Sequence, residues 1–485
     1  MVGIVLFGCS FYFRKEANAS EAFTSGAGHL PAWAVGMSIF ATFVSSISFL
    51  GLPAKAYTGN WNAFVFSLSV PVASWMAARF FVPLYRSLNS VSAYSYLETR
   101  FGPWARVYAS LCYLVTQVAR MGTIMYLLAL PLNALLGWSI PMIIVITGVG
   151  TLLYSMMGGI QAVVWTDAIQ GIILIAGTLL CLAVLLFSMP QGVGQAWEIA
   201  ASAHKFGLGS WSLWDWGSET FWVCFVYGVF INLQNYGIDQ NYIQRYMTAR
   251  TQRDAVRSTL FGSLLYVPVS FLFFLIGTAM FAYYRAQPAL LPPEVAARPD
   301  QILPFFIVKG LPVGITGLLI ASVFAAGMST IATSLNSGAT IVLEDYYKRY
   351  VNPQASDRQS LRLLQGGTLA LAVLGVGCAL AMMRVKSALD AWWALSSVFS
   401  GGMLGLFLLG YFSRKARNPE AILGAVLGVL VIAWISVFQK FWPLPVKLHT
   451  NLSIVFGTTV IFLTGFVLSV ALRQNGKKQG PEGSV

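Results

Sequence analysis

Long apolar runs, each about as long as a bilayer is thick, alternate along the chain with short polar segments. A helix needs about 20 mainly apolar residues to cross the hydrocarbon core of a bilayer. The pattern therefore predicts an all-α polytopic membrane protein. The full spans are expected at approximately 31–57, 61–83, 106–131, 139–158, 160–188, 218–243, 257–284, 312–343, 361–383, 390–412, 419–438 and 449–472.

The opening run from Met1 to Phe13 is apolar but is only about half as long as a span. It resembles the apolar stretch of a signal peptide, yet no basic residue precedes it and no small-residue cleavage site follows. We interpret it as a truncated first helix, which brings the expected number of transmembrane helices to about 13.

Composition supports this picture, because 57% of the 485 residues are hydrophobic and only 10% are charged. A soluble protein carries about 25% charged residues, so an ordinary soluble enzyme is excluded. The net charge of +13 comes from short basic blocks between apolar runs, which indicates membrane topology and not nucleic acid. Of the 30 Lys and Arg, 20 fall on the side expected to be cytoplasmic and 9 on the other.

The remaining basic residue, Arg120, lies near the middle of an apolar run, where burying a charge costs several kcal/mol. A guanidinium fixed there is suited to hold a planar carboxylate through two parallel hydrogen bonds. The alternative is a structural arginine satisfied by helix-end carbonyls or by an acid of the protein.

Three further polar features mark the spans. Asp167 lies about two turns into its span and is suited to bind a cation, relay a proton or cap a helix. Hydroxyl clusters at 41–48 and 329–334 interrupt two apolar runs, and we expect a break in each helix there. Unwound carbonyls and hydroxyls provide the oxygen ligands that sodium prefers. Such clusters are alternatively packing interfaces between helices.

Other function classes lack the residues they need. The chain has no Gly-x-x-x-x-Gly-Lys-Ser/Thr motif for nucleotide-driven pumping. Its three histidines, His29, His204 and His449, stand near span ends, so a histidine-based metal or catalytic centre is not indicated and an enzyme is not expected. A channel stays open as an alternative, although no filter-like repeat is visible.

Five segments of the chain carry a recognisable pattern, at 30–57, 93–102, 157–167, 239–245 and 329–337. They resemble the sodium/solute symporter family, and the similarity extends along almost the whole chain. Within this family the chain resembles chiefly the bacterial sodium/sialic acid symporters, because of the continuous match from Pro31 to Trp61 and the placement of Arg120.

The resemblance implies the leucine-transporter fold, in which two inverted five-helix repeats form the core and outer helices are added. The implied division is a truncated first helix and cytoplasmic loop at 1–30, a first repeat at 31–188, an external loop at 189–217, a second repeat at 218–412, two additional helices at 413–472 and a cytoplasmic tail at 473–485.

Sodium is the coupling ion that the resemblance implies. The general sodium site maps to the backbone carbonyls of Ala41, Val44 and Ala326 and the hydroxyls of Ser329 and Thr330. A second sodium site maps to Asp167, Ser329, Ala332 and Thr333. Ala332 has no hydroxyl, so the second ion is a weaker expectation.

The implied substrate pocket keeps its carboxylate anchor but differs around it. Arg120 matches the arginine that holds the sialic acid carboxylate, whereas Phe43, Ala63 and Ser67 replace an expected threonine, aromatic residue and glutamine. The other predicted substrate-binding residues are Ser45, Ser46, Ser48, Asn232, Asn235 and Tyr236.

The sequence thus predicts a sodium-coupled secondary active symporter that imports a carboxylated sugar, with sialic acid (N-acetylneuraminate) as the leading candidate. A neutral sugar, a monocarboxylate and an amino acid are alternative solutes, and a ligand sensor that does not transport is a remote alternative. The expected partners are the solute, sodium and the lipid bilayer, without nucleic acid, in a monomer of a bacterial inner membrane.

Overall fold

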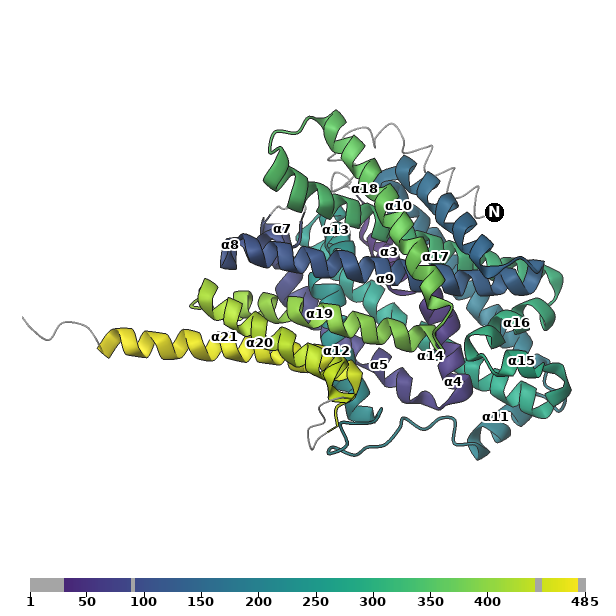
Figure 1. Ribbon diagram of the computed structural model, residues 1–485. Helices are drawn as coiled ribbons and strands as arrows, with labels where there is room; N and C mark the ends of the chain where they lie inside the picture. Colours follow the sequence, from purple (N-terminus) through teal and green to yellow (C-terminus); the bar gives the residue numbers. More distant parts are fainter. Residues whose placement is uncertain (1–29, 89–91, 441–446, 479–485) are drawn as a thin grey trace, which may run out of the picture.

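The computed structural model describes residues 30–88, 92–440 and 447–478, and these residues fold almost entirely into helices (Figure 1). The first half contains α3 (Ala32–Phe43), η3 (Ile47–Gly51), α4 (Leu52–Thr58), η4 (Trp61–Phe64), α5 (Val65–Leu68), α6 (Val70–Met76), η5 (Ala77–Phe81), α7 (Val82–Leu88), α8 (Ser95–Phe101), α9 (Pro103–Leu136), α10 (Ile140–Phe187) and α11 (Val193–Ser202). The second half contains α12 (Phe221–Ile238), α13 (Gln240–Thr248), α14 (Gln252–Ala286), η6 (Pro288–Leu290), α15 (Pro293–Ala296), η7 (Pro299–Gln301), α16 (Ile302–Lys309), α17 (Val313–Ile341), η8 (Val342–Val351), α18 (Asp357–Met382), α19 (Ala388–Phe412), α20 (Asn418–Ser436), η9 (Phe438–Lys440), η10 (Thr450–Leu452) and α21 (Ser453–Lys478).

Within these described ranges, nine helices are long and apolar enough to cross a membrane, and a bent pair makes a tenth span. The all-α membrane architecture predicted from the sequence is therefore confirmed. The predicted span 218–243 does not reach this measure. It corresponds to α12, whose Asn232, Gln234 and Asn235 lower its mean hydropathy. The expected truncated helix at 1–13 lies outside the described residues.

The spans expected at 139–158 and 160–188 both lie in the single helix α10. A helix of 48 residues is about 72 Å long, more than twice the thickness of the hydrocarbon core. Its segment Val163–Phe187 qualifies as a span, whereas Ile140–Leu153 is a shorter apolar helix. The predicted helix boundary near residue 159 is absent, since no proline interrupts the ladder of backbone hydrogen bonds there.

The first full span is broken, as the sequence predicted. Helix α3 ends at Phe43, Val44 adopts extended backbone angles, and the chain continues as Ile47–Thr58 with a bend of 54°. A second break, which the sequence did not predict, separates α12 from α13 at Asp239, whose φ and ψ are −79° and 126°. The carboxylate of Asp239 caps α13 by accepting a hydrogen bond from the amide of Asn241 at 2.8 Å.

The break predicted in the eighth span is wrong, because α17 continues unbroken from Val313 to Ile341. Within the cluster, Thr330 donates to the carbonyl of Ala326, four residues earlier, at 3.0 Å. Ser329 instead donates to the carboxylate of Asp167, and Thr333 accepts a hydrogen bond from Arg245 at 3.0 Å. These partners are reached from an unbroken helix, so the hydroxyls of this cluster do not require unwound backbone.

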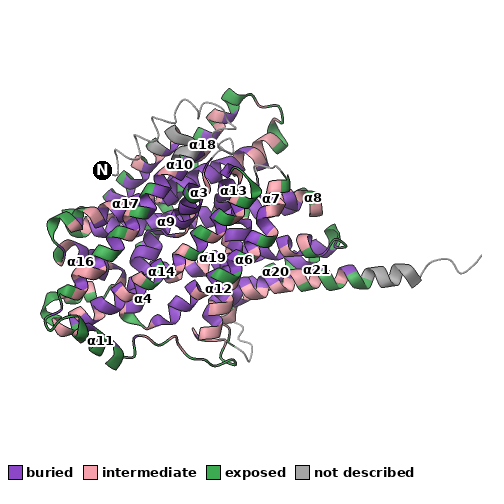
Figure 2. Ribbon diagram, turned by 180° about the vertical axis from the view of Figure 1, so that it is seen from behind, coloured by how far each residue is buried: buried purple, intermediate pink, exposed green. Residues whose placement is uncertain are grey.

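The helices differ in how much of their surface the protein covers. In the most apolar window of α9, 72% of residues are buried, whereas the corresponding value is 33% for α18 and 39% for α20. Figure 2 shows buried residues concentrated in the central helices and exposed ones along α20 and α21. We conclude that α9 belongs to the core and that α18, α20 and α21 face lipid.

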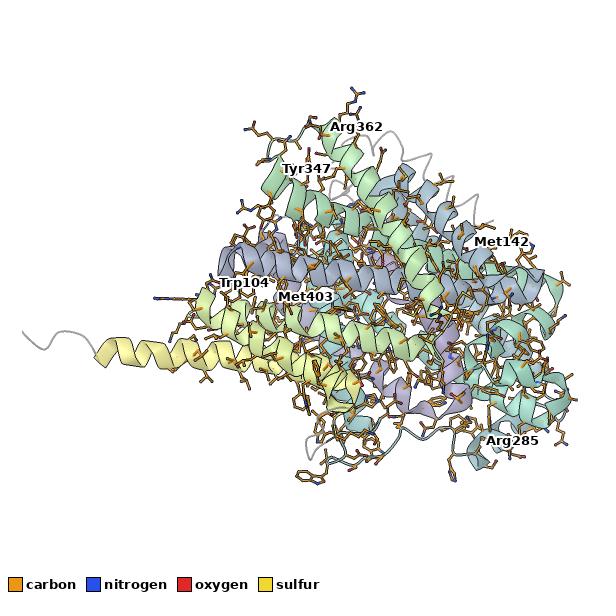
Figure 3. All side chains as sticks on the ribbon, viewed as in Figure 1. Trp104, Met142, Arg285, Tyr347, Arg362 and Met403 are labelled. Carbon is orange, nitrogen blue, oxygen red and sulfur yellow. The ribbon has the colours of Figure 1, made fainter. Side chains whose placement is uncertain are left out.

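The structure separates two residues that the predicted topology places on opposite sides of the membrane. Arg285, expected on the external side, and Trp104, in a segment expected on the cytoplasmic side, lie at opposite ends of the molecule (Figure 3). Helices α4, α15 and α16 gather at the external end (Figure 1).

Helix α14 lies against both halves of the broken first span, and glycines allow the close approach. A Cβ atom on Gly262 would lie 3.0 Å from the Cβ of Ile39 in α3, and one on Gly277 would lie 2.7 Å from the Cβ of Ala56 in α4. Such distances are shorter than van der Waals contact, so only glycine fits at either crossing.

We expect Gly277→Ala to lower the midpoint of thermal unfolding in detergent, because the added methyl group overpacks the α4–α14 crossing at a cost of about 1–3 kcal/mol. Gly377→Ala on α18 is the matched control, since a Cβ there meets no atom within 4 Å. Alanine is the better helix former at such an open position, so the control should keep or raise the midpoint. Equal midpoints for the two variants would contradict the proposed crossing.

Candidate functional site

A cavity lies beside the break of the first span and encloses about 570 Å³ of space free of protein atoms, its opening included. Residues from the ends of the broken helices and from α9, α14 and α19 surround it. Its walls are formed by Phe43, Ser45, Ile47, Ser48, Leu52, Phe66, Arg120, Tyr227, Ile231, Asn235, Tyr242, Tyr266, Leu389, Trp392, Trp393 and Ser396. This mixture of aromatic surface with a few polar groups is typical of small-molecule sites.

Arg120 is the only charged residue in this wall, and only 7% of its surface is exposed. Helix α9 holds it at the level of the break, where its Nη2 donates to the carbonyl of Thr42 at 2.6 Å. Thr42 is among the last residues of α3, whose final carbonyls lack partners within the helix. A guanidinium has five N–H donors, so Arg120 stabilises this helix end while it also lines the cavity.

Five of the predicted substrate residues line the cavity, namely Phe43, Ser45, Ser48, Arg120 and Asn235. The other five lie behind its wall. Ser46 donates to the carbonyl of Ile124 at 3.4 Å, Ser67 is hydrogen-bonded to Ser270 at 2.7 Å, and the amide of Asn232 donates to Ser69 at 3.1 Å. Ala63 is buried in η4, and Tyr236 stacks on Phe43 with ring centroids 5.2 Å apart.

Sequence reasoning did not identify the aromatic residues of α13, α14 and α19 in the wall. Tyr242 and Tyr266 contribute from α13 and α14, and Trp392, Trp393 and Ser396 contribute from α19. The adjacent tryptophans are visible in the sequence, but aromatic residues are also common at membrane interfaces. Their role becomes visible only once α19 is placed beside the break.

The five predicted ligands of the general sodium site are all nearly inaccessible, with exposures of 3% or less. Ala41 and Val44 stand at the end of α3, and Ala326, Ser329 and Thr330 lie on one side of α17, which packs on α3. Because α3 stops at Phe43, its last carbonyls have no amide of the same helix to bind. Such carbonyls, together with hydroxyls, form a set of neutral oxygen donors that suits sodium.

Asp167, predicted to bind a second sodium ion, is fully buried, and its carboxylate has partners within the protein. Its carboxylate accepts hydrogen bonds from Ser38 at 2.5 Å and from Ser329, and it forms an ion pair with Arg245 at 2.8 Å. The same Nη2 of Arg245 donates to the hydroxyl of Thr333 at 3.0 Å. The guanidinium therefore lies between two of the residues predicted to hold the second ion.

Arg245 is one of the 20 basic residues counted on the side expected to be cytoplasmic, and its position corrects that count. It is fully buried in α13, the helix that follows the break at Asp239. Its Nε also donates to Ser38 at 2.7 Å, and its Nη1 donates to the carbonyl of Asn241 at 2.7 Å.

A chain of hydrogen bonds links this ion pair toward the cavity. Asn241 donates to Gln117 at 3.0 Å and accepts from Tyr113 at 3.1 Å, and Gln117 in turn donates to Asp239 at 3.4 Å. Tyr113 is also 2.7 Å from the hydroxyl of Ser337 on α17. Because Gln117 is one turn from Arg120 on α9, the polar interior is continuous from the ion pair to the cavity wall.

Comparison with known proteins supplies the family. A model described as "Sodium:solute symporter family" matches residues 23–428. The chain belongs to this family. Sodium is therefore its coupling ion, and it is a transporter rather than an enzyme.

The relatives include two bacterial proteins of similar length. The "Sodium/sialic acid symporter NanT" of Aliivibrio fischeri is 32% identical over 96% of this chain and 90% of its own length. The "Sodium/sialic acid symporter SiaT" of Proteus mirabilis is 33% identical over 87% of this chain and 85% of its own. These likenesses agree with a multi-pass protein of a bacterial inner membrane.

The structural comparisons confirm the leucine-transporter fold. A substrate-bound, outward-open structure of a Na⁺-coupled sialic acid symporter matches with a TM-score of 0.88 and 30% identity, covering 97% of this chain and 98% of that one. The nucleobase–cation symporter Mhp1, at 14% identity and a TM-score of 0.59, covers 95% of this chain and 96% of its own and shares the fold alone.

Proposed function

We propose that this symporter couples inward sodium movement to the import of a carboxylated sugar, with N-acetylneuraminate as the substrate. The observation that carries the proposal is Arg120, a buried guanidinium in the wall of a cavity at membrane depth. Both sialic acid symporters among the relatives match almost the full chain. Ser45 and Ser48 stand opposite the arginine's helix on the broken span and supply hydroxyls for the sugar.

Sodium enters this mechanism as a substrate that joins two helices. The carbonyls of Ala41 and Val44 and the hydroxyls of α17 would bind the ion, which fixes the end of α3 against α17. Thr42 lies between Ala41 and Val44 in the sequence, and its carbonyl accepts a hydrogen bond from Arg120. Ion binding therefore also orients the Arg120 guanidinium for the substrate carboxylate. Simultaneous occupancy then favours rocking of the bundle toward the inward-facing state.

A different anion is the competing substrate class. Other relatives are named as a sodium-coupled monocarboxylate transporter and a sodium/iodide cotransporter, and a fixed guanidinium suits each of these anions. A neutral sugar has no carboxylate for Arg120 to bind, and an amino acid brings an ammonium group together with its carboxylate, for which the described residues of the cavity wall include no acidic partner.

Proteoliposomes holding the purified protein should accumulate radiolabelled N-acetylneuraminate under an inward sodium gradient and not when potassium replaces sodium. Arg120→Ala should abolish uptake, because loss of the charge-assisted anchor costs about 2–4 kcal/mol, which is a loss of affinity of about 30-fold or more. Arg120→Lys keeps the charge but not the planar fork and should retain only weak uptake.

Sodium-dependent thermal stabilisation should persist in Arg120→Ala, which shows that the variant is folded. Full uptake by Arg120→Ala would refute the anchor. Absence of uptake by the wild-type protein, with sodium stabilisation intact, would point to another anion, and competition with lactate and iodide would identify the class. Substrate binding without accumulation would indicate a sensor.

Thr330→Ala should raise the sodium concentration for half-maximal uptake about tenfold, equivalent to about 1.4 kcal/mol, because one oxygen ligand is lost. Ser322→Ala is the matched control on the same helix, since its hydroxyl donates only to the carbonyl of Leu318 at 2.7 Å. An unchanged sodium requirement in Thr330→Ala, or an equal change in both variants, would exclude the proposed ion site.

We further infer that one sodium ion accompanies each substrate, because Arg245 already neutralises Asp167 and Ala332 lacks a hydroxyl. One sodium with one carboxylate carries no net charge. A potassium diffusion potential set with valinomycin should then leave accumulation unchanged at a fixed sodium gradient. Two sodium ions would move one net charge, and an inside-negative potential of 100 mV would add about 2.3 kcal/mol of driving force. Stronger accumulation under that potential would overturn the one-ion assignment.

A further inference from the structure

A second and larger cavity opens at the external end of the bundle, with about 1350 Å³ of space free of protein atoms, its mouth included. It lies between α4, the η7 turn and the segment that leads into α19. We call it the outer vestibule, and its walls are Gly51, Ala54, Lys55, Thr58, Tyr126, Ala297, Arg298, Pro299, Asp300, Gln301, Met383, Arg384, Val385, Lys386, Ser387 and Asp390.

The outer vestibule has more basic than acidic side chains, four against two. Both acidic side chains already have partners in the protein. Asp390 forms an ion pair with Lys55 at 2.8 Å, and Asp300 accepts a hydrogen bond from the amide of Ala388 at 3.0 Å. Burial also raises the pKa of the Asp300 carboxyl above its ordinary value.

The other three cations, Arg298, Arg384 and Lys386, are exposed and form no ion pair within the described parts of the chain. They come from two segments that face each other across the outer vestibule. Charges of one sign that line a concave surface focus their field into it and enrich counter-ions there. The outer vestibule is therefore suited to attract anions.

The outer vestibule and the central cavity are lined by neighbouring residues of the same two segments. Gly51 and Asp390 line the outer space, whereas their neighbours Leu52 and Leu389 line the inner one. A Cβ atom on Gly51 would lie 3.1 Å from the Cβ of Leu389, so the two segments are packed together. The outer vestibule and the central cavity thus adjoin at this contact.

We propose that the outer vestibule is a second binding site for the anionic sugar, in which Arg298, Arg384 and Lys386 hold its carboxylate before it passes Leu389. This inference rests on the proposed function for the identity of the sugar. The three cations bind the sugar as it arrives from outside, whereas Arg120 binds it in the central cavity beside the sodium site. Weak and reversible capture fits exposed cations, because water and salt screen them.

The charge of the outer vestibule can be measured without transport. A Thr58→Cys variant places a thiol in its wall, where anionic sulfonatoethyl and cationic trimethylammonium methanethiosulfonates compete as labels. The ratio of anionic to cationic labelling rates should fall about tenfold when Arg298, Arg384 and Lys386 are all replaced by glutamine. Lys309→Gln is the matched control, since this exposed cation on α16 is not part of the outer vestibule wall. An unchanged ratio in the triple variant would overturn the electrostatic basis of the site.

Occupancy is tested by protection with N-acetylneuraminate. Millimolar N-acetylneuraminate should slow labelling of Thr58→Cys by at least about twofold in the Arg120→Ala background, where the central site is disabled, and the effect should vanish in the triple glutamine variant. No protection in a protein that still transports the sugar would refute the second site alone. Protection in a wild-type protein without uptake would leave the site standing and refute the proposed transport function.

Discussion

A charge buried in hydrocarbon must meet an opposite charge, and this requirement organises the centre of the protein. Asp167 of α10 and Arg245 of α13 are both fully buried and lie 2.8 Å apart. Ser38 of α3 donates a hydrogen bond to Asp167 and accepts one from Arg245. On α17, Ser329 donates to Asp167 and Thr333 accepts from Arg245. Four helices from both halves of the chain therefore meet at one ion pair, and separating any of them would leave polar groups unsatisfied in a membrane.

Buried polar groups also need partners where the broken helices end. A helix that stops inside the membrane exposes carbonyls that lipid cannot satisfy. At the end of α3, Arg120 donates a hydrogen bond to the carbonyl of Thr42. At the start of α13, the carboxylate of Asp239 accepts a hydrogen bond from the amide of Asn241. The polar interior supplies partners at both breaks, so the unpaired oxygens that remain at the end of α3 lie where an ion can use them.

The apolar pattern was sufficient to predict the membrane helices, and the rarity of buried charge was sufficient to single out Arg120 and Asp167. The two hydroxyl clusters look alike in sequence, yet only the first accompanies a break; α17 continues through the second, where Thr330 donates to the carbonyl of Ala326 and Ser329 donates to Asp167. Arg245 resembled a loop residue because Arg250 and Arg253 follow it closely. Its partner is 78 residues away, and nothing local to either residue indicates that pairing. Likewise, the tryptophans of α19 become part of a site only through the packing of distant helices.

The contact of α14 with the broken span has a mechanical consequence. Gly262 touches α3 on one side of the 54° bend, and Gly277 touches α4 on the other. These two glycines are 15 residues apart on one helix, which corresponds to about 22 Å along its axis, and Pro268 lies between them. Helix α14 therefore packs on both sides of the bend. If α3 and α4 change their mutual angle, at least one of them must slide or lift along α14, or α14 must itself bend at Pro268. The missing side chains of Gly262 and Gly277 leave room for such sliding at both crossings.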